Sequence, residues 1–227
     1  MIIVTGASGG LGNALLDHLA PLDDLIGVYN RTVPSARSTP GLVFERVNLE
    51  EPSQIHSFVN QWKSKLSKIT LVHFAGLSLD GLAANYAEDD WDRVMRVNLK
   101  ANVLLTQALL PHMIEQRWGR IVHISSVVGT QGRVGTLAYS TSKSGLLGMS
   151  RVLAKESGRF GVTSNVLVLG YFNVGLIDTL SEDSREEIRL QIPSRVFGDV
   201  ANVANAIEFV IKSDFVNGAA INIDGGI

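Results

Sequence analysis

The chain contains no cysteine among its 227 residues. That absence excludes disulfide bonds, thiolate chemistry and cysteine-ligated metal sites. The sequence also has no apolar run of the roughly 18 residues that a membrane helix needs. Its opening residues, 1–6, carry neither the basic stretch nor the cleavage pattern of a secretory signal. We therefore expect a cytoplasmic protein without disulfides, and we expect no metal site.

Excess charge of either sign is also missing. The formal net charge is −2, so no bulk attraction to nucleic acid or to an anionic membrane is implied. Hydrophobic residues make up 45% and charged residues 19%, a balance typical of globular proteins. The length suits one large α/β domain better than two.

Short apolar runs alternate with helical patterns along the whole chain. The runs are rich in β-branched residues and nearly continuous, which is typical of strands buried on both faces of a parallel sheet. The expected strands are residues 2–4, 25–29, 42–44, 69–74, 120–124, 162–169 and 219–223. The expected helices are residues 11–20, 54–66, 91–116, 137–158 and 200–212. This order predicts one Rossmann-like domain over 1–227, a doubly wound parallel sheet of about seven strands with helices on both faces.

Two segments break the alternation. Residues 31–41, with two prolines and several hydroxyl side chains, read as a loop. Residues 170–197 are a longer irregular stretch with one charged helical piece at 181–191. We expect a substrate lid at about 171–197, because long excursions after a strand's carboxyl end line the ligand crevice of open α/β sheets. The apolar residues of this lid suit an acyl chain better than a polyol; they are Tyr171, Phe172, Val174, Leu176, Ile177 and Leu180. The alternative is that these residues only pack the lid helix onto the core.

A glycine-rich turn follows the first strand. Gly6, Gly10 and Gly12 have the spacing G-x-x-x-G-x-G, and a helix starts there. Glycines let the backbone approach a pyrophosphate, and helix amides favour its charge. We expect Ser8 and Leu11 of the same turn to contact the cofactor as well. The alternative is an ordinary tight β–α connection.

The end of the second expected strand bears on cofactor choice. It reads Tyr29-Asn30-Arg31-Thr32, without the acid that often holds an adenosine ribose. The planar, permanently charged guanidinium of Arg31 suits a 2′-phosphate. We therefore favour NADP(H) over NAD(H), with Asn30 and Arg31 as contacts; the alternative is a solvated loop arginine.

Tyr139 and Lys143 lie four positions apart on an expected helix, so they share a face. A phenol has a pKa of about 10, and acid/base work near neutrality favours a value closer to 7, which a nearby ammonium helps to reach. Ser126 follows a strand at its carboxyl end, where its hydroxyl can hold a substrate oxygen. Asn98, inside the expected helix 91–116, can bend that helix or hold a water. Taken alone, each has an ordinary reading as a surface pair, a turn residue or a satisfied buried amide.

Together these residues resemble the short-chain dehydrogenase/reductase family. The glycine turn, then Asn98, Ser126, Tyr139 and Lys143, match its cofactor motif and catalytic tetrad in order and spacing, and the match runs over almost the whole chain. The resemblance implies an NAD(P)-dependent oxidoreductase acting on CH-OH/C=O groups. Tyr139 is then the acid/base, and Lys143 lowers its pKa and binds the nicotinamide ribose. Ser126 positions the carbonyl, and Asn98 holds a water in a proton relay.

Some positions depart from the family's pattern. Residues 73–76 read His-Phe-Ala-Gly instead of Asn-Asn-Ala-Gly; Ala75 and Gly76 still permit close approach to the ribose, and His73 is expected to be a satisfied core histidine. Asn48 replaces an aspartate and can meet adenine through its amide. A glycine, Gly170, follows the sixth strand without the usual proline before it. Val174 takes the place of a threonine, and Asn173 beside it is a possible substitute for the nicotinamide contact.

Within the family, residues 119–129 and 191–193 look most like 3-oxoacyl-[acyl-carrier-protein] reductases of fatty acid biosynthesis. This resemblance implies reduction of a 3-oxoacyl thioester on acyl carrier protein, an acidic partner for which Arg117, Arg120 and Arg159 offer a basic docking edge near the site. It also implies a homotetramer formed through the helices at 91–116 and 137–158. Two alternatives stay open: a reductase of another ketone or secondary alcohol (a sugar, polyol or polyketide intermediate), and a cofactor-sensing protein without catalysis.

Overall fold

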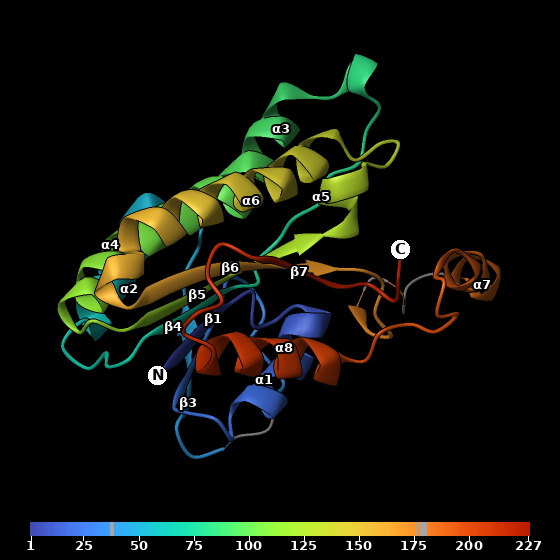
Figure 1. Cartoon of the computed structure of the whole chain (residues 1–227). Helices are drawn as coiled ribbons and strands as arrows, with labels where there is room; N and C mark the ends of the chain where they lie inside the picture. The colour runs from blue at the N-terminus through green and yellow to red at the C-terminus, as the bar shows by residue number, and fades with distance from the viewer. Residues whose placement is uncertain (37–38, 176, 178–180) are drawn as a thin grey trace.

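A parallel sheet forms the centre of the molecule (Figure 1). The structure is a computed structural model that describes residues 1–36, 39–175, 177 and 181–227. Its seven strands lie in the order β3-β2-β1-β4-β5-β6-β7, and every neighbouring pair is parallel. The strands are β1 (Ile2–Thr5), β2 (Leu25–Tyr29), β3 (Leu42–Arg46), β4 (Thr70–His73), β5 (Gly119–Ser126), β6 (Val162–Leu169) and β7 (Ala220–Ile223). The predicted doubly wound, Rossmann-like sheet is confirmed.

Burial of the strands follows their place in the sheet. Strands β1, β4 and β6 are buried at every position, as strands covered by helices on both faces are, and in β6 this includes the polar residues Thr163, Ser164 and Asn165. The edge strands β3 and β7 alternate between partly buried and exposed residues instead. An edge strand has a neighbour on one side only, so part of its surface stays in water.

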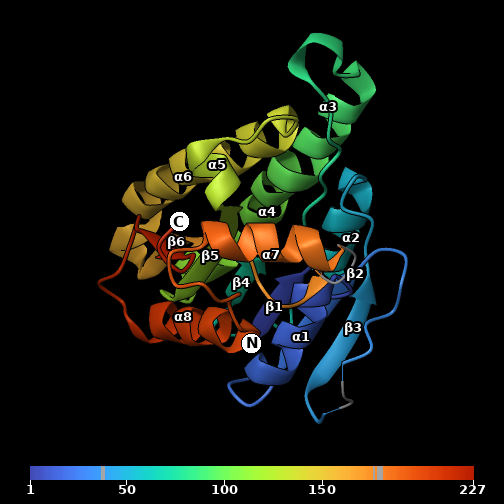
Figure 2. The same ribbon diagram turned by 90° about the vertical axis from the view of Figure 1, so that its right-hand side faces the viewer.

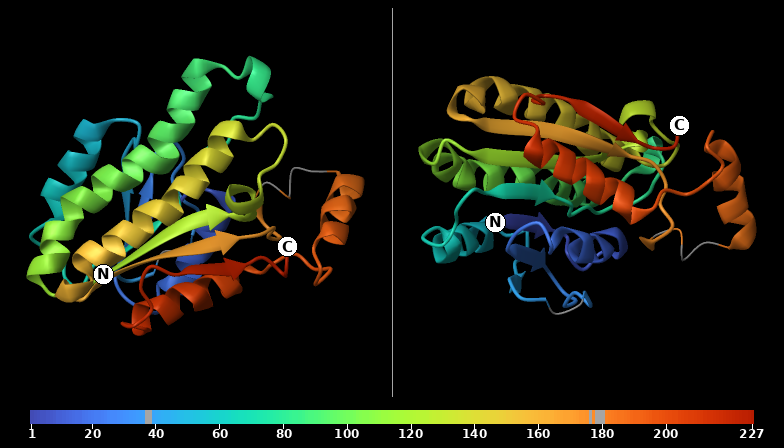
Figure 3. Two further views of the ribbon diagram at one scale, coloured as in Figure 1. Left: turned by 45° about the horizontal axis from the view of Figure 1, so that its top comes forward. Right: turned by 60° about the horizontal axis from the view of Figure 1, so that its bottom comes forward.

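Helices cover both faces of the sheet (Figures 1 and 3). The helices are α1 (Gly10–Leu19), α2 (Pro52–Trp62), η1 (Ala83–Asn85), α3 (Glu88–Met95), η2 (Arg96–Lys100), α4 (Ala101–Glu115), α5 (Val127–Gln131), α6 (Leu137–Ser157), η3 (Gly158–Phe160), α7 (Glu182–Gln191) and α8 (Val200–Lys212). On one face α1 packs against α8, with Leu15, Leu16 and Ile207 in one core cluster. On the other face α2, α4 and α6 pack over the sheet. Each fully buried leucine or isoleucine contributes about 1.5–3 kcal/mol.

The expected helix 91–116 is not one regular helix. It consists of α3, a wider π-helical turn (η2) and α4, and Asn98 lies in the middle of that turn. A side-chain amide that bonds elsewhere can open the regular ladder, and π-turns are frequent at functional sites. The short helices η1 and α5 lay within segments where we had predicted no element.

The carboxyl ends of the strands all point to one edge of the sheet. Figure 2 looks onto this edge, and α7 crosses in front of it; Figure 1 shows α7 standing off from the body of the molecule at the same end. Helix α7 begins after Ser181, whose hydroxyl accepts a hydrogen bond from the amide of Ser184. Within the described ranges, no helix is both long and apolar enough to cross a membrane.

Candidate active site

An open cavity of about 800 Å³ lies at the carboxyl ends of the strands. Of the residues predicted for the cofactor turn and the catalytic tetrad and their neighbours, Asn98 and Arg31 are not part of its wall. The predicted residues that do line it are Gly6, Ser8, Gly10, Leu11, Gly12, Asn30, Asn48, Ala75, Gly76, Ser126, Tyr139, Lys143 and Gly170. Residues distant in the sequence are therefore brought to one place, which is the place where open parallel sheets bind ligands.

The glycine turn is packed tightly against the end of β4. Gly6 has a φ of +73°, and a Cβ there would lie 2.6 Å from the Cα of Ala75. At Gly12 a Cβ would lie 2.2 Å from the carbonyl oxygen of Gly6. Thr5 links the end of β1 to the segment after β4, because its Oγ1 accepts hydrogen bonds from the backbone amides of Phe74 and Ala75, both at 3.1 Å. The first turn of α1 thus faces the cavity with no side-chain cap at Gly9, an arrangement suited to an anion.

The ends of β2 and β3 form the next part of the wall. Asn30 Nδ2 donates to Asn48 Oδ1 at 3.2 Å, and the amide of Glu50 donates to the same oxygen at 3.1 Å. Arg46 Nε donates to the carbonyl of Asn30 at 3.0 Å. The side-chain oxygen of Asn48 therefore already accepts two hydrogen bonds. Its side-chain NH₂ group is the part that can donate a hydrogen bond to the adenine base of a cofactor. Arg31 is exposed just outside the wall.

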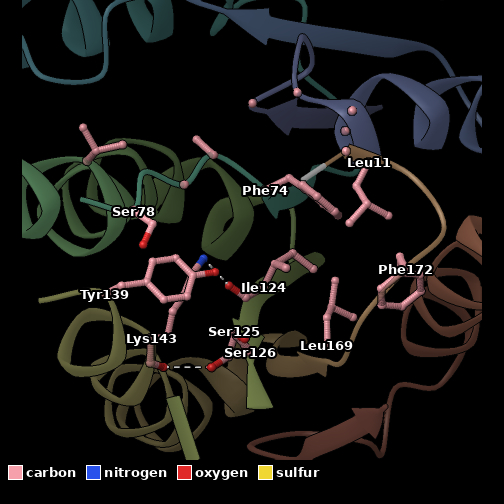
Figure 4. Close-up of a pocket in the computed structure, with 18 of the residues that line it drawn as sticks. Leu11, Phe74, Ser78, Ile124, Ser125, Ser126, Tyr139, Lys143, Leu169 and Phe172 are labelled. Carbon is pink, nitrogen blue, oxygen red and sulfur yellow. Dashed lines mark hydrogen bonds between the residues drawn. The ribbon is translucent and has the colours of Figure 1, made fainter. Parts of the chain in front are cut away.

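Tyr139 and Lys143 project from α6 toward the end of β5 (Figure 4). Lys143 is buried, and its Nζ donates to the carbonyl oxygen of Ile124 at 2.8 Å and lies 5.6 Å from the centre of the Tyr139 ring. Ser125 Oγ donates to the carbonyl of Lys143 at 2.9 Å, which ties the helix to the strand. Ser126 caps α5, where its Oγ accepts a bond from the amide of Val128 at 3.2 Å. Its own proton can be donated to an oxygen in the cavity, including that of the Tyr139 phenol.

The electrostatics of the tyrosine differ from the expectation. Burial raises the pKa of Tyr139, the hydrogen bond with Ser126 lowers it, and the carboxylate of Asp80 raises it further. The net direction is upward, whereas we had expected Lys143 to lower this pKa. Burial also lowers the pKa of Lys143 to about 8. The phenol is thus protonated at neutral pH and ready to donate, with Ser126 as the group that favours its anion.

Asn98 is held by three protein groups. Its Oδ1 accepts from the amide of Leu77 at 2.8 Å, and its Nδ2 donates to the carbonyl of Leu77 at 2.9 Å and to Ser142 Oγ at 3.0 Å. Ser142 Oγ in turn donates to the carbonyl of Tyr139 at 2.8 Å. The side chain of Asn98 therefore fixes the segment after β4 and reaches the tyrosine's backbone through Ser142.

Two histidines stack beneath the site. His73 and His123 are paired across β4 and β5, with ring centres 5.1 Å apart and planes within 5°. His73 Nε2 lies 2.9 Å from Thr106 Oγ1 and His123 Nε2 lies 3.1 Å from Ser164 Oγ, but neither Nδ1 has a partner in the described structure. Burial, with a contribution from the charge of Lys143, lowers the pKa of His123 to about 3; burial and the charges of His123 and Lys143 hold the pKa of His73 well below its ordinary value. His73 is a core residue as expected, but only one of its two ring nitrogens, Nε2, has a hydrogen-bond partner in the described structure.

Two expectations need correction. Asn173 is exposed and lies outside the cavity wall, whereas Val174 lies in it, so Asn173 is not placed to substitute for a threonine. Arg120 is buried, and its guanidinium donates to the carbonyls of Ile211, Gly119 and Gly161. Arg117 and Arg159 are joined to each other, but they lie beside the amino ends of β5 and β6, opposite to the cavity. The three arginines therefore form no docking edge near the site of their own chain.

The predictions missed several groups that complete the site. Thr5, Ser125 and Ser142 make the bonds described above, and Asp80 lines the cavity. Each lies within a few residues of a recognised motif, but Thr5, Ser125 and Ser142 also bond to groups in distant segments, 69, 18 and 44 residues away. Of the lid residues expected to meet an acyl chain, Tyr171, Phe172, Val174 and Ile177 line the cavity. Leu176 and Leu180 lie outside the described residues, as do positions 37–38 of the expected loop.

Comparison with known proteins agrees with this geometry. The family model described as short chain dehydrogenase matches residues 1–185. The chain is 34% identical over 233 residues to the 3-oxoacyl-[acyl-carrier-protein] reductase FabG of Rickettsia conorii, covering 99% of this chain and 95% of that protein. It is 36% identical to the FabG reductase of Thermotoga maritima, over 99% and 96% of the two chains. It is also 32% identical to nodulation protein G of a Rhizobium species, over 99% and 95%.

The family match spans the glycine turn, the wall of the cavity except Ile188, and α6, and the similarity to the relatives covers 99% of the chain. The chain therefore belongs to the short-chain dehydrogenase/reductase family, whose members are oxidoreductases acting on CH-OH or C=O groups with an NAD(P) cofactor.

Proposed function

We propose that the protein is an NADPH-dependent reductase of 3-oxoacyl thioesters carried on acyl carrier protein, giving the 3-hydroxyacyl product. The observation that carries the proposal is the meeting of Ser126, Tyr139 and Lys143 in one cavity with the glycine turn on its opposite side. The residues present fit a dinucleotide: a helix amino end without a side-chain cap for the pyrophosphate, and open glycine and alanine positions for the riboses. Bound NADPH supplies the hydride.

The chain's own residues handle the substrate oxygen. Ser126, whose Oγ already accepts from the amide of Val128, donates its O–H as a hydrogen bond to the carbonyl. Tyr139 gives its proton to the same oxygen as charge develops there. Lys143 holds the nicotinamide ribose and keeps a positive charge near the phenol, and Ile124 anchors its ammonium. We propose that Asn98 orders the relay by fixing Leu77 and Ser142, with a water held near its backbone.

NADP(H) is the proposed cofactor. The end of β2 carries no acid, and Arg31 follows the cavity residue Asn30 at the edge of the wall. An arginine there can reach a 2′-phosphate that an NAD-binding acid would repel. Neighbouring Asn48 keeps an NH₂ donor for the adenine.

Support for an acyl substrate comes from the wall after β6 and from the relatives' names. Phe172 and Ile177 are buried there, and Tyr171, Val174 and Ile188 of α7 complete an apolar surface. We propose that residues 171–197 act as the substrate lid of a single domain covering 1–227. The FabG reductases with 30–36% identity carry 3-oxoacyl-[acyl-carrier-protein] reductase as their name.

Assembly and location are further parts of the proposal. Val103 on α4 and Val152 on α6 are large apolar side chains that are 43% and 53% exposed. A second copy packed on these helices would cover them, in keeping with a cytoplasmic homotetramer. Light scattering of the purified protein tests the assembly.

A spectrophotometric screen tests the function. NADPH and NADH are each offered with acetoacetyl thioesters, cyclic ketones and, in the reverse direction with the oxidised cofactors, sugar alcohols. The proposal expects oxidation of NADPH with the thioesters at a kcat/KM at least tenfold above any other pair. A preference for a cyclic ketone or a polyol would favour another substrate class, and no turnover with any of them would favour a cofactor-sensing protein.

A further inference from the structure

A second cavity of about 400 Å³ opens beside the first. It lies between the end of α5 and α7, and Ile227 forms part of its wall. Val128, Arg133, Tyr171 and Ile188 line both cavities, so the two share a boundary on the Ser126 side of the site. A substrate whose carbonyl lies at Tyr139 therefore has a second space into which it can extend.

The walls of the two cavities differ chemically. The wall of the first after β6 is apolar, whereas the wall of the second includes Gln131, Ser184, Glu187 and Gln191 among apolar residues such as Val127 and Ile227. Gln131 and Gln191 are exposed, and amide side chains both donate and accept hydrogen bonds, so each can pair with an amide of a ligand that replaces its water. The second cavity therefore fits a polar chain containing amides better than an acyl tail.

Arg133 stands where the two cavities meet, on a loop whose backbone is held in place. Its carbonyl accepts hydrogen bonds from the amide and the hydroxyl of Thr136, at 3.2 and 2.7 Å. The amide of Gly81 donates to the carbonyl of Gly135 at 2.8 Å, which ties the loop to the segment after β4. The side chain of Arg133 is exposed and forms no ion pair within the described ranges. An exposed guanidinium on a fixed backbone is suited to an anionic group.

We propose that the second cavity binds the amide-bearing arm of a carrier thioester, with Arg133 contacting the phosphate at the end of that arm. The acyl group then stays in the first cavity against Phe172 and Ile177, and the amides of the arm pair with Gln131 and Gln191. This inference rests on the proposed reduction of thioesters. It adds a binding site that would favour a substrate attached to a carrier arm over a ketone without one.

Three substrates with the same reacting group test it. Acetoacetyl phosphopantetheine has arm and phosphate, acetoacetyl pantetheine lacks the phosphate, and ethyl acetoacetate lacks both. Arg133→Ala is expected to raise KM about tenfold for the first substrate and leave the other two unchanged, the effect of losing one charge-assisted contact. Gln131→Ala is expected to raise KM about threefold for both arm-bearing substrates and leave ethyl acetoacetate unchanged. Arg151→Ala, an exposed arginine elsewhere on α6, is the matched control.

The outcomes separate the two proposals. Unchanged kcat with ethyl acetoacetate shows that each variant is folded and catalytically intact. If the variants have the same KM as wild type for every substrate, the arm site is overturned and thioester reduction stands. The same conclusion follows if KM rises by the same factor for all three substrates. A wild-type enzyme that reduces ethyl acetoacetate but neither thioester refutes the proposed function itself, and the arm site with it.

Discussion

The Nδ2 of Asn98 donates a hydrogen bond to the Oγ of Ser142 at 3.0 Å, and that hydroxyl donates a hydrogen bond to the backbone carbonyl oxygen of Tyr139. The π-helical turn that carries Asn98 is thereby joined to the helix that carries the tyrosine. The same amide holds both backbone groups of Leu77. One side chain thus fixes the cavity wall after β4 and, through Ser142, the position of Tyr139.

Replacing Ser142 with alanine tests this connection. We expect kcat to fall about tenfold, or about 1.4 kcal/mol, because Tyr139 loses a fixed position relative to Ser126. The dissociation constant for NADPH should change less than threefold. Steady-state kinetics and titration of the cofactor's fluorescence measure the two.

Thr141→Ala is the control for Ser142→Ala. Thr141 is an exposed residue of α6, and its hydroxyl also donates to a helix carbonyl, that of Leu137 at 2.8 Å. It should leave kcat within twofold of wild type. Equal kcat for the two variants would mean that the link through Ser142 does not position the tyrosine.

Cofactor choice is tested by Arg31→Asp. The carboxylate would repel a 2′-phosphate and accept hydrogen bonds from a 2′-hydroxyl, so NADPH affinity should fall at least tenfold while NADH affinity holds or improves. Binding of each nucleotide to the variant gives the answer without turnover. The same loss for both nucleotides would refute the assignment of Arg31.

Burial of Lys143 opposes folding. Its pKa is about 8 in the folded chain against an ordinary value of 10.5, so the buried ammonium is destabilising below pH 8, and this penalty is relieved as pH rises from about 8 toward 10.5. Lys143→Met should therefore be more stable than wild type at pH 7, by about 1–3 kcal/mol, while turnover is lost. Urea unfolding at pH 7 and pH 9.5 measures the gap. A gap that does not narrow at the higher pH would contradict this explanation.

His123 makes the fold sensitive to acid. Its pKa is about 3 in the folded chain, so the unfolded chain takes up the proton first and stability falls as pH drops from about 6.5 to about 3. His123→Gln keeps a donor for Ser164 without a titrating group. Between pH 7 and pH 4.5 the wild type should lose about 2–3 kcal/mol more than the variant, measured by urea unfolding. Identical losses would show that this histidine does not govern the acid sensitivity.

Much of the fold was predictable from the sequence, because each strand is a short apolar run bounded by turn residues. Local spacing predicts that Tyr139 and Lys143 share a helical face. That they meet the glycine turn in one site was expected from the family resemblance and from the ligand crevice at the carboxyl ends of parallel strands. A bend at Asn98 was one of the sequence-based expectations, but the π-helical form of the turn was not predictable, since it depends on bonds to Leu77 and Ser142, 21 and 44 residues away. The direction of the Tyr139 pKa was missed for the same reason: burial and the carboxylate of Asp80 follow from tertiary packing.

The central claim is that the Tyr139 hydroxyl gives its proton to a carbonyl reduced by a bound nicotinamide. Tyr139→Phe removes that hydroxyl and keeps the ring. NADPH oxidation with acetoacetyl phosphopantetheine should fall at least a thousandfold, as loss of a general acid implies, while the NADPH dissociation constant stays within about threefold of wild type. Turnover at the wild-type rate in this variant would contradict the account.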